Sequence, residues 1–281
     1  MQTKENILIA EIGSTSGSWA FISNHGADAQ VIKTPGYNPH THSEYILERL
    51  LIKLKGDIGT PVRIMYYGTG VVSAEVSEMI AGKIKTQFEG ATVEVHSDTL
   101  AAARASCGMH PGIVCILGTG SNSCIYDGEQ ITDSIPSLGY PLGDEGSGWH
   151  IGLDIIRGYY YRTMPTDLVG AVKDLLPDSR AELLEYVKHS PTPNTYLGSF
   201  ANFAGEQKSH PWIRKTVRKC FDEFVITHIQ PLQTKGKIHF VGSIAWSFSE
   251  ILEESLAQYN FEIGQVLKDP MDALTKYHLS V

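Results

Sequence analysis

Three short turns rich in glycine, serine and threonine follow apolar runs, and turns of this composition can bind anions. They are Gly13-Ser14-Thr15, Gly118-Thr119-Gly120-Ser121-Asn122 and Gly242-Ser243. Small residues between a strand and the next element leave backbone N–H groups exposed, and such groups form a concave site for phosphate. None of the turns is a Walker A loop, because neither Gly82-Lys83 nor Gly236-Lys237 is followed by Ser or Thr, and protein-kinase signatures are absent from the sequence. The turns therefore predict a nucleotide site of another type.

Asp98 is the first candidate for acid–base chemistry. It closes the strand-like run 92–97 and opens a helical run. A carboxylate at the carboxyl end of a strand in an α/β sheet lies where ligands bind, and it could take a proton from a hydroxyl during phosphoryl transfer. An Asp at such a position is also a common helix cap, so the sequence leaves both roles open.

Further acidic residues stand beside the turns. The segment Gly143-Asp144-Glu145-Gly146-Ser147 places two acids before a helix, where they would suit the helix dipole. Alternatively, Asp144 would accept hydrogen bonds from sugar hydroxyls, or one of the two acids would help to hold Mg²⁺. Glu11 lies in an apolar strand, which is a poor place for a carboxylate unless it faces a ligand, and it is a candidate ligand of Mg²⁺ through water. The eleven histidines show no metal-ligand spacing, so no histidine-based metal cluster is expected.

Charge and composition narrow the class of protein. The 281 residues hold 31 acidic against 23 basic side chains, a net charge of -8, which argues against a nucleic-acid partner. No apolar run approaches the roughly 18 residues that span a membrane, and Lys4-Glu5-Asn6 interrupts the start of the chain before a signal-peptide core could form. A cytoplasmic protein without a membrane partner is expected. The cysteines form no C-x-x-C pair and are expected to be reduced packing residues; they are Cys107, Cys115, Cys124 and Cys220.

The elements that must position these residues alternate along the chain. Apolar periodicity predicts strands over 7–12, 18–22, 30–33, 62–67 and 92–96, and helices over 41–54, 74–88 and 98–106. Later helices are predicted over 147–161, 167–176, 181–188, 210–229, 245–259 and 270–279, with a strand over 237–241. Such alternation favours an α/β fold.

The opening hairpin recurs. Residues 117–126 can be laid on 12–21 without a gap, each being an apolar strand, a Gly/Ser/Thr turn and a second apolar strand. Such turns are common in hairpins, but a matched pair about a hundred residues apart predicts two domains of similar topology. We expect the first domain to cover 1–105, completed by a C-terminal helix at 268–281, and the second to cover 106–267 with a helical insertion.

The motifs resemble a known family in their types and order. The five motifs are Glu11-Ile12-Gly13-Ser14-Thr15, Ser97-Asp98, Leu117-Gly118-Thr119-Gly120-Ser121-Asn122, Gly143-Asp144-Glu145-Gly146-Ser147 and Val241-Gly242-Ser243. Over nearly its whole length the chain is similar to the N-acetylglucosamine kinases, members of the BadF/BadG/BcrA/BcrD-type ATPase family in the actin, sugar kinase and Hsp70 superfamily. The resemblance implies an α/β fold of two ribonuclease H-like (actin-like ATPase) domains with a nucleotide and sugar cleft between them.

The resemblance also implies roles for single residues and the use of ATP with Mg²⁺. The ATP-binding residues would be Gly13, Ser14, Thr15, Gly118, Thr119 and Gly120 at the phosphates, with Gly242, Ser243 and Ser247 around the adenosine. Asp98 would take the proton of the sugar 6-hydroxyl, and Glu11 would hold the metal through water. The residues lining the sugar would be Asn38, Asp98, Ser121, Asn122, Ser137, Leu138, Gly139 and Asp144.

The chain departs from the family pattern in two places. The first loop has Ile12 and Ser14 where the family usually shows glycines, and the stretch Ser137-Leu138-Gly139-Tyr140 lacks the glycine and tryptophan pattern of the animal enzymes. The expected activity is ATP-dependent phosphorylation of the 6-hydroxyl of an amino sugar, above all N-acetylglucosamine, with small molecules as partners and a homodimer left open. An ATPase activase or switch without a sugar acceptor and a non-catalytic sugar-binding regulator are the alternatives.

Overall fold

The computed structural model describes residues 5–23, 29–135 and 137–280. The chain forms two compact units, one made of Met1–Gly108 with Pro270–Val281 and the other of Met109–Asp269. In the part that the structure describes, no helix is long and apolar enough to cross a membrane.

The first unit is built on a mixed sheet with the strand order β3-β2-β1-β4-β5. Its strands are β1 Ile7–Ile12, β2 Ser16–Ile22, β3 Ala29–Pro35, β4 Arg63–Gly68 and β5 Thr92–Ser97. Strands β1, β2 and β3 are antiparallel neighbours, whereas β4 and β5 run parallel to β1. Since side chains alternate along a strand, Leu8, Ala10 and Ile12 face one side, where they join a core with residues of α1 (Glu44–Asp57) and α2 (Ala74–Gln87).

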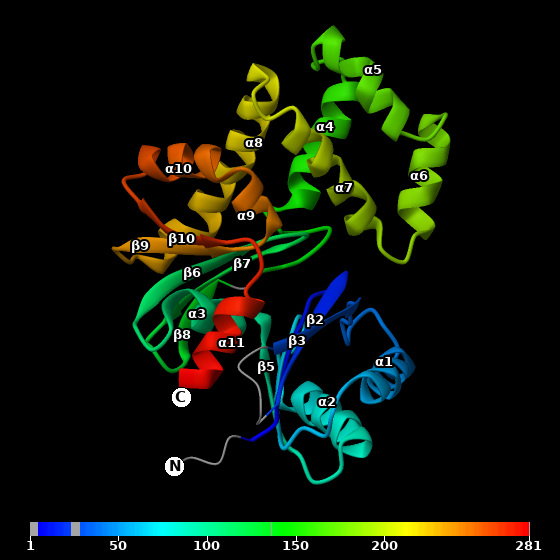
Figure 1. Ribbon diagram of the computed structural model, residues 1–281. Helices are drawn as coiled ribbons and strands as arrows, with labels where there is room; N and C mark the ends of the chain where they lie inside the picture. The colour runs from blue at the N-terminus through cyan, green and yellow to red at the C-terminus, as the bar shows by residue number, and fades with distance from the viewer. Residues whose placement is uncertain (1–4, 24–28, 136, 281) are drawn as a thin grey trace. The chain divides into compact units, whose positions relative to one another are not determined.

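Two helices far apart in the sequence pair within the first unit. Helix α3 (Asp98–Cys107) and the C-terminal helix α11 (Met271–Ser280) contact each other, and Figure 1 shows them side by side. Helix α11 buries Met271, Leu274 and His278. The last residues of the chain are therefore part of the unit with which the chain begins.

The second unit repeats the strand pattern of the first. Its sheet has the order β10-β9-β6-β7-β8, in which β6, β7 and β8 are antiparallel neighbours and β9 and β10 run parallel to β6. The strands are β6 Gly112–Leu117, β7 Ser121–Tyr126, β8 Ile131–Ile135, β9 Lys237–Val241 and β10 Glu262–Leu267. The predicted α/β class and the duplicated hairpin are confirmed.

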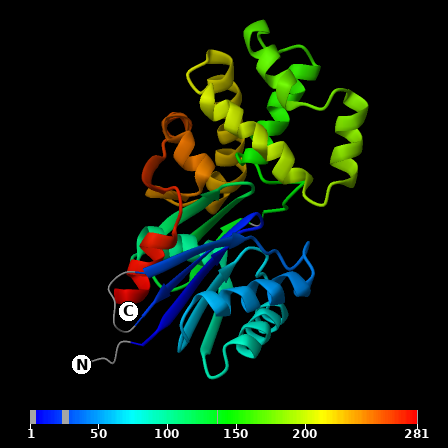
Figure 2. The ribbon, with the colours of Figure 1, turned by 45° about the vertical axis from the view of Figure 1, so that its right-hand side comes forward.

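A group of helices separates β8 from β9 in the sequence. These helices are α4 Gly148–Tyr160, α5 Thr166–Leu175, α6 Arg180–His189, α7 Pro193–Glu206 and α8 Pro211–Phe224, followed by the π-helix η1 Val225–Ile229 and the 3₁₀ turn η2 Gln230–Leu232. Helix α9 (Ser243–Ser247) follows β9, and α10 (Ser249–Gln258) precedes β10. Figures 1 and 2 both show α5 and α6 farther from β6 and β7 than α4.

The largest differences from the sequence prediction concern three elements and two of the predicted helices. Strands β8 and β10 and helix α7 were not predicted. The segment predicted as one helix over 245–259 is divided at Phe248. The helix predicted over 210–229 becomes a π-helix after Phe224. Helix α7 contains weak helix formers, including Gly198 and Gly205, and is stabilised by packing instead. It lies so close to α4 that a Cβ at Gly152 would stand 1.8 Å from the carbonyl oxygen of Leu197.

Candidate active site

The first glycine turn is held by the segment that follows β3. The N–H of Gly13 donates to the oxygen of Ser16 at 2.9 Å, and the N–H of Tyr37 donates to the oxygen of Gly13 at 3.1 Å. The two segments are so close that a Cβ at Gly36 would lie 2.2 Å from the Gly13 oxygen. One residue further on, the side-chain amide of Asn38 donates to the hydroxyl of Ser14 at 3.4 Å. The structure thus brings the predicted sugar residue Asn38 to the predicted phosphate turn.

Asp98 lies at the same edge of the sheet as this turn. The register aligns Ile12, Gly68 and Ser97, the last residues of three parallel strands. Helix α3 is capped by Ser97, whose hydroxyl accepts the N–H of Leu100 at 3.2 Å. Ser97, and not Asp98, is therefore the N-cap residue of α3, although the backbone N–H groups of Asp98 and Thr99 also hydrogen-bond to the Asp98 carboxylate.

The surroundings of Asp98 favour a stronger base. Burial raises the pKa of its carboxyl, although hydrogen bonds from Thr69 and Thr99 oppose the rise. Thr69 is itself fixed to the glycine-turn edge, because its N–H donates to the oxygen of Ile12 at 2.9 Å. The Thr99 hydroxyl lies 3.3 Å from Oδ1 of Asp98. These contacts hold the carboxylate in one orientation.

Two buried tyrosines stand beside the acids of the first unit. The hydroxyls of Tyr37 and Tyr66 are buried without a hydrogen-bond partner among the described residues. Burial, then the Tyr37 hydroxyl and the carboxylates of Asp98 and Glu11, raise the pKa of the Tyr66 phenol. Glu11 is half-buried on β1, opposite Ser18 and Tyr67 in the strand register. Glu11, the predicted metal ligand, and Asp98, the predicted base, therefore both raise the pKa of the buried Tyr66 hydroxyl.

The second and third glycine turns are neighbours in the second unit. Residues 118–120 join β6 to β7, so the predicted turn residues Ser121 and Asn122 begin β7. The Gly118 oxygen accepts the N–H of Gly148 at 2.8 Å. Gly242 has a φ of 126°, and a Cβ there would stand 2.2 Å from the oxygen of Leu117. Only glycine fits this position, because its backbone approaches β6 closely in a conformation that other residues rarely adopt.

Asp144 connects the second turn to the predicted sugar segment. Its side chain is buried, and its Oδ1 accepts both the N–H of Ser121 at 3.1 Å and the hydroxyl of Ser137 at 2.8 Å. The N–H of Gly139 donates to the same Ser137 hydroxyl at 3.2 Å. The structure therefore brings together four of the residues predicted to line the sugar. Leu138, between them, is 69% exposed.

The remaining predicted residues lie around the same turns. Asn122 is half-buried, and its Oδ1 accepts the N–H of Ser123 at 2.9 Å. Ser243 and Ser247 are the first and last residues of α9, which starts directly after Gly242. Ser247 lines a small pocket together with Lys208, Arg214, Phe248, Ser249, Glu250 and Ile251.

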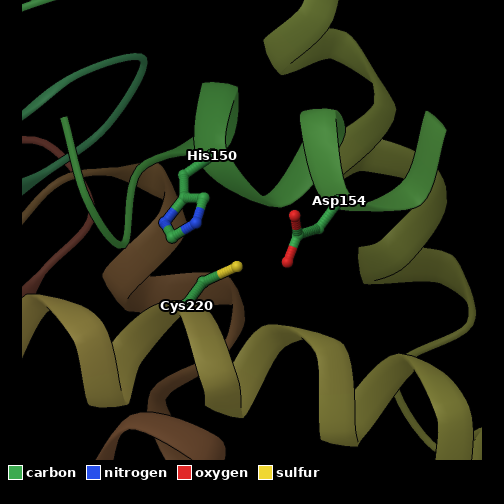
Figure 3. Close-up of side chains that lie close together, drawn as sticks. All are labelled: His150, Asp154 and Cys220. Carbon is green, nitrogen blue, oxygen red and sulfur yellow. The ribbon is translucent and has the colours of Figure 1, made fainter. Parts of the chain in front are cut away.

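One cluster was missed by the sequence prediction. His150, Asp154 and Cys220 place one potential ligand atom each within 4.8 Å of the others, and Figure 3 shows their side chains pointing toward one another. His150 and Asp154 are one turn apart on α4, so their i, i+4 spacing in the sequence could have indicated that their side chains are neighbours. Cys220 comes from α8, and nothing in the sequence connects it to them.

Comparisons with known proteins agree with this arrangement. No protein-family model matches the chain. A candidate N-acetylglucosamine kinase from Porphyromonas gingivalis is 32% identical, with a TM-score of 0.90 and coverage of 98% of this chain and 99% of that one. A candidate N-acetylglucosamine kinase from Chromobacterium violaceum, 16% identical with a TM-score of 0.73 over 98% of this chain and 99% of its own, shows the same fold. The N-acetyl-D-glucosamine kinase of Dictyostelium discoideum is 24% identical over 172 residues, so the match spans 55% of this chain and only 54% of that relative.

Proposed function

The chain belongs to the N-acetylglucosamine kinase family of actin-like ATPases, and on that premise we propose that it transfers the γ-phosphate of ATP to the 6-hydroxyl of N-acetylglucosamine or a close amino sugar. The observation that carries the proposal is the state of Asp98. It lies at the strand edge that bears the first glycine turn, it is not the N-cap residue of α3, and burial raises the pKa of its carboxyl.

Asp98 would act as the general base. A raised pKa makes a carboxylate a better proton acceptor, and the hydrogen bonds from Thr69 and Thr99 orient it. As the sugar O6 forms its bond to the γ-phosphorus, the O6 proton passes to Asp98. The bond from the γ-phosphorus to the bridging oxygen breaks, and ADP leaves with that oxygen.

Backbone N–H groups would bind the phosphates of ATP. The turns Gly13–Thr15 and Gly118–Gly120 would supply such groups without a basic side chain, which suits a chain with a net charge of -8. The N–H groups of Gly13 and Gly118 donate within the turns, to the oxygens of Ser16 and Gly120, and so help to hold the turns in shape. A bound Mg²⁺ would neutralise charge on the phosphate oxygens, and a carboxylate is a fitting ligand for it. Glu11, half-buried on the strand that ends at the first turn, would hold the ion through water.

The segment around Asp144 would orient the sugar. Because Oδ1 of Asp144 accepts the Ser121 and Ser137 hydrogen bonds, a sugar hydroxyl would donate to Oδ2. Asn38 and Asn122 offer amide groups for further hydroxyls, and exposed Leu138 offers apolar surface. Several polar groups fixed before binding make such a site specific for hydroxyl positions.

The test replaces the proposed base and a matched acid on the same element. Asp98→Asn should lower sugar-dependent ADP release by at least about a hundredfold while ATP binding changes less than about twofold. Glu94→Gln removes the same charge from an exposed position on β5 and should leave turnover unchanged. Near-normal turnover of Asp98→Asn would show that Asp98 is not the base.

A panel of plain and N-acetylated hexoses tests the acceptor. If no sugar changes the rate of ADP release, the chain is an ATPase without a sugar acceptor. If a sugar binds but no ADP is released, the chain is a sugar-binding regulator.

A further inference from the structure

His150 lies in the cluster of Figure 3 and also contacts the segment that carries Asp144. Its Nδ1 accepts the N–H of Gly146 at 3.1 Å, and its Nε2 stands 3.3 Å from a carboxylate oxygen of Glu223. Burial lowers the pKa of this imidazole, so the ring is neutral and carries one proton. Because Nδ1 is an acceptor, that proton lies on Nε2 and points to Glu223.

This tautomer does not fit a metal ligand. A metal ion at Nε2 would need the electron pair that the proton occupies, and ligating histidines donate from their other nitrogen, whereas Nδ1 here accepts. Asp154 is already paired, with Oδ1 at 3.3 Å from Arg157 and Oδ2 at 2.8 Å from Lys219. Burial raises the pKa of the Cys220 thiol, which disfavours the thiolate that a metal binds. The chemistry of these three side chains therefore disfavours a metal site, and His150 has a different role.

We propose that His150 is a positioning residue, which fixes the segment 143–147 and so places Asp144 for the sugar. The inference rests on the proposed function, since it concerns the same sugar site. The segment needs such support because Asp144 and Gly146 both have positive φ, 67° and 73°. Asp144 is not a glycine, so its surroundings must hold this backbone.

Neighbouring groups leave the segment little freedom. A Cβ at Gly146 would stand 2.8 Å from the Cβ of Phe224, so the segment is packed on the end of α8. A second buried histidine, His228 of the π-helix η1, faces Glu145, with 3.1 Å between Nε2 and Oε2. The ring of His228 stacks on Phe224 at 4.9 Å. The two residues that follow Asp144 are thus each held by a buried histidine.

The His150 contact is sensitive to acid. Protonation turns Nδ1 from an acceptor into a donor, so the bond from Gly146 is lost. Burial and Lys219 disfavour the protonated ring, whereas the carboxylates of Glu223, Asp154 and Glu145 favour it. Burial has the largest effect, and the pKa lies below its ordinary value of 6.5. The acceptor is therefore intact at neutral pH and is lost as pH falls through this lowered pKa.

The test compares two substitutions at His150. In His150→Asn the side-chain oxygen can take the place of Nδ1 as acceptor and cannot titrate, whereas His150→Leu fills the space without an acceptor. We expect His150→Leu to raise the sugar KM by about tenfold with little change in the ATP KM, since a buried N–H loses its partner. His150→Asn should stay within about threefold of wild type, and it should lack the rise of sugar KM that wild type shows as pH falls through the lowered pKa of His150.

A matched control uses the same chemistry elsewhere. His210 also accepts a backbone N–H at Nδ1, from Trp212 at 3.1 Å, and its Nε2 faces Asp167 at 3.2 Å. His210→Asn should therefore leave the sugar KM and its pH profile unchanged. Amide hydrogen exchange of residues 143–147 without sugar should be faster in His150→Leu and near wild type in His150→Asn.

Three results would overturn the inference. Unchanged sugar KM and exchange in His150→Leu would show that the contact does not position the segment. Equal defects in both variants would show that volume or ring packing matters, and not the acceptor. Stoichiometric zinc that survives treatment with EDTA and is lost in His150→Leu would show a metal site. If the wild-type chain shows no sugar-dependent turnover, the proposed function fails, but the exchange of 143–147 still decides the positioning role.

Discussion

The attachment of helix α11 should be sensitive to acid, because it includes a buried histidine. Arg104 donates to the Tyr67 hydroxyl at 2.6 Å, so the hydroxyl proton is directed to Nε2 of His278, 2.8 Å away. His278 is 7% exposed and accepts this proton only when its ring is neutral. Burial, then the charges of Arg104, Arg63 and His96, lower the pKa of His278 to about 4 from the ordinary 6.5.

The size of the effect follows from this pKa. In the unfolded chain His278 binds its proton near pH 6.5, whereas in the folded chain it does so near pH 4. Between these values the unfolded state holds more protons, so stability is lost as pH falls. Since one pKa unit corresponds to about 1.36 kcal/mol, the loss is about 2 kcal/mol at pH 5 and about 3 kcal/mol at pH 4.

A variant that cannot titrate isolates this contribution. His278→Gln can still accept from Tyr67 but holds no charge, so other groups titrate equally in both proteins. Urea unfolding followed by pulsed hydrogen exchange of β4 and α11 reports on the first unit alone. Between pH 7 and pH 5, wild type should lose about 2 kcal/mol more than the variant. Parallel pH profiles of the two proteins would refute the reasoning.

Two further predictions concern the second glycine edge and the thiols. Gly242→Ala should destabilise the second unit by about 2 kcal/mol or more and weaken ATP binding, because the added Cβ would meet the oxygen of Leu117. Chemical unfolding measures the loss of stability, and nucleotide titration measures the loss of affinity. Gly82→Ala in α2, where nothing lies within 4 Å, should instead stabilise slightly, and equal losses in the two variants would contradict the argument. With a thiol reagent in native conditions, half-buried Cys107 should react before the other three cysteines, which should react only on unfolding. The reaction of Cys107 should be slow, because burial raises the pKa of its thiol to about 11. Early loss of a buried thiol would contradict this order.

The fold was predictable where the pattern is local. The apolar strands on each side of Gly13 and Gly118 gave two hairpins, and their repetition gave the two similar sheets. Strands β8 and β10 could not be found because their residues are mostly half-buried or exposed, with no apolar alternation. Helix α7 forms because its small residues allow close approach to α4, which is a property of the packed pair.

The candidate site was predictable in its residues but not in its contacts. The turns and Asp98 follow strands, so their place at a sheet edge could be inferred. That Ser97, and not Asp98, caps α3 depends on a side-chain rotamer. The tautomer of His150 depends on Gly146 and Glu223, from elements that only the folded chain brings together.

The central claim is transfer of phosphate to a sugar hydroxyl, and its most direct test is identification of the product. The wild-type chain is incubated with ATP, Mg²⁺ and N-acetylglucosamine, and the phosphorylated products are identified by ³¹P NMR. We predict a sugar 6-phosphate in equal amount to the ADP formed. ADP formed together with inorganic phosphate alone, at the same rate with and without sugar, would contradict the account.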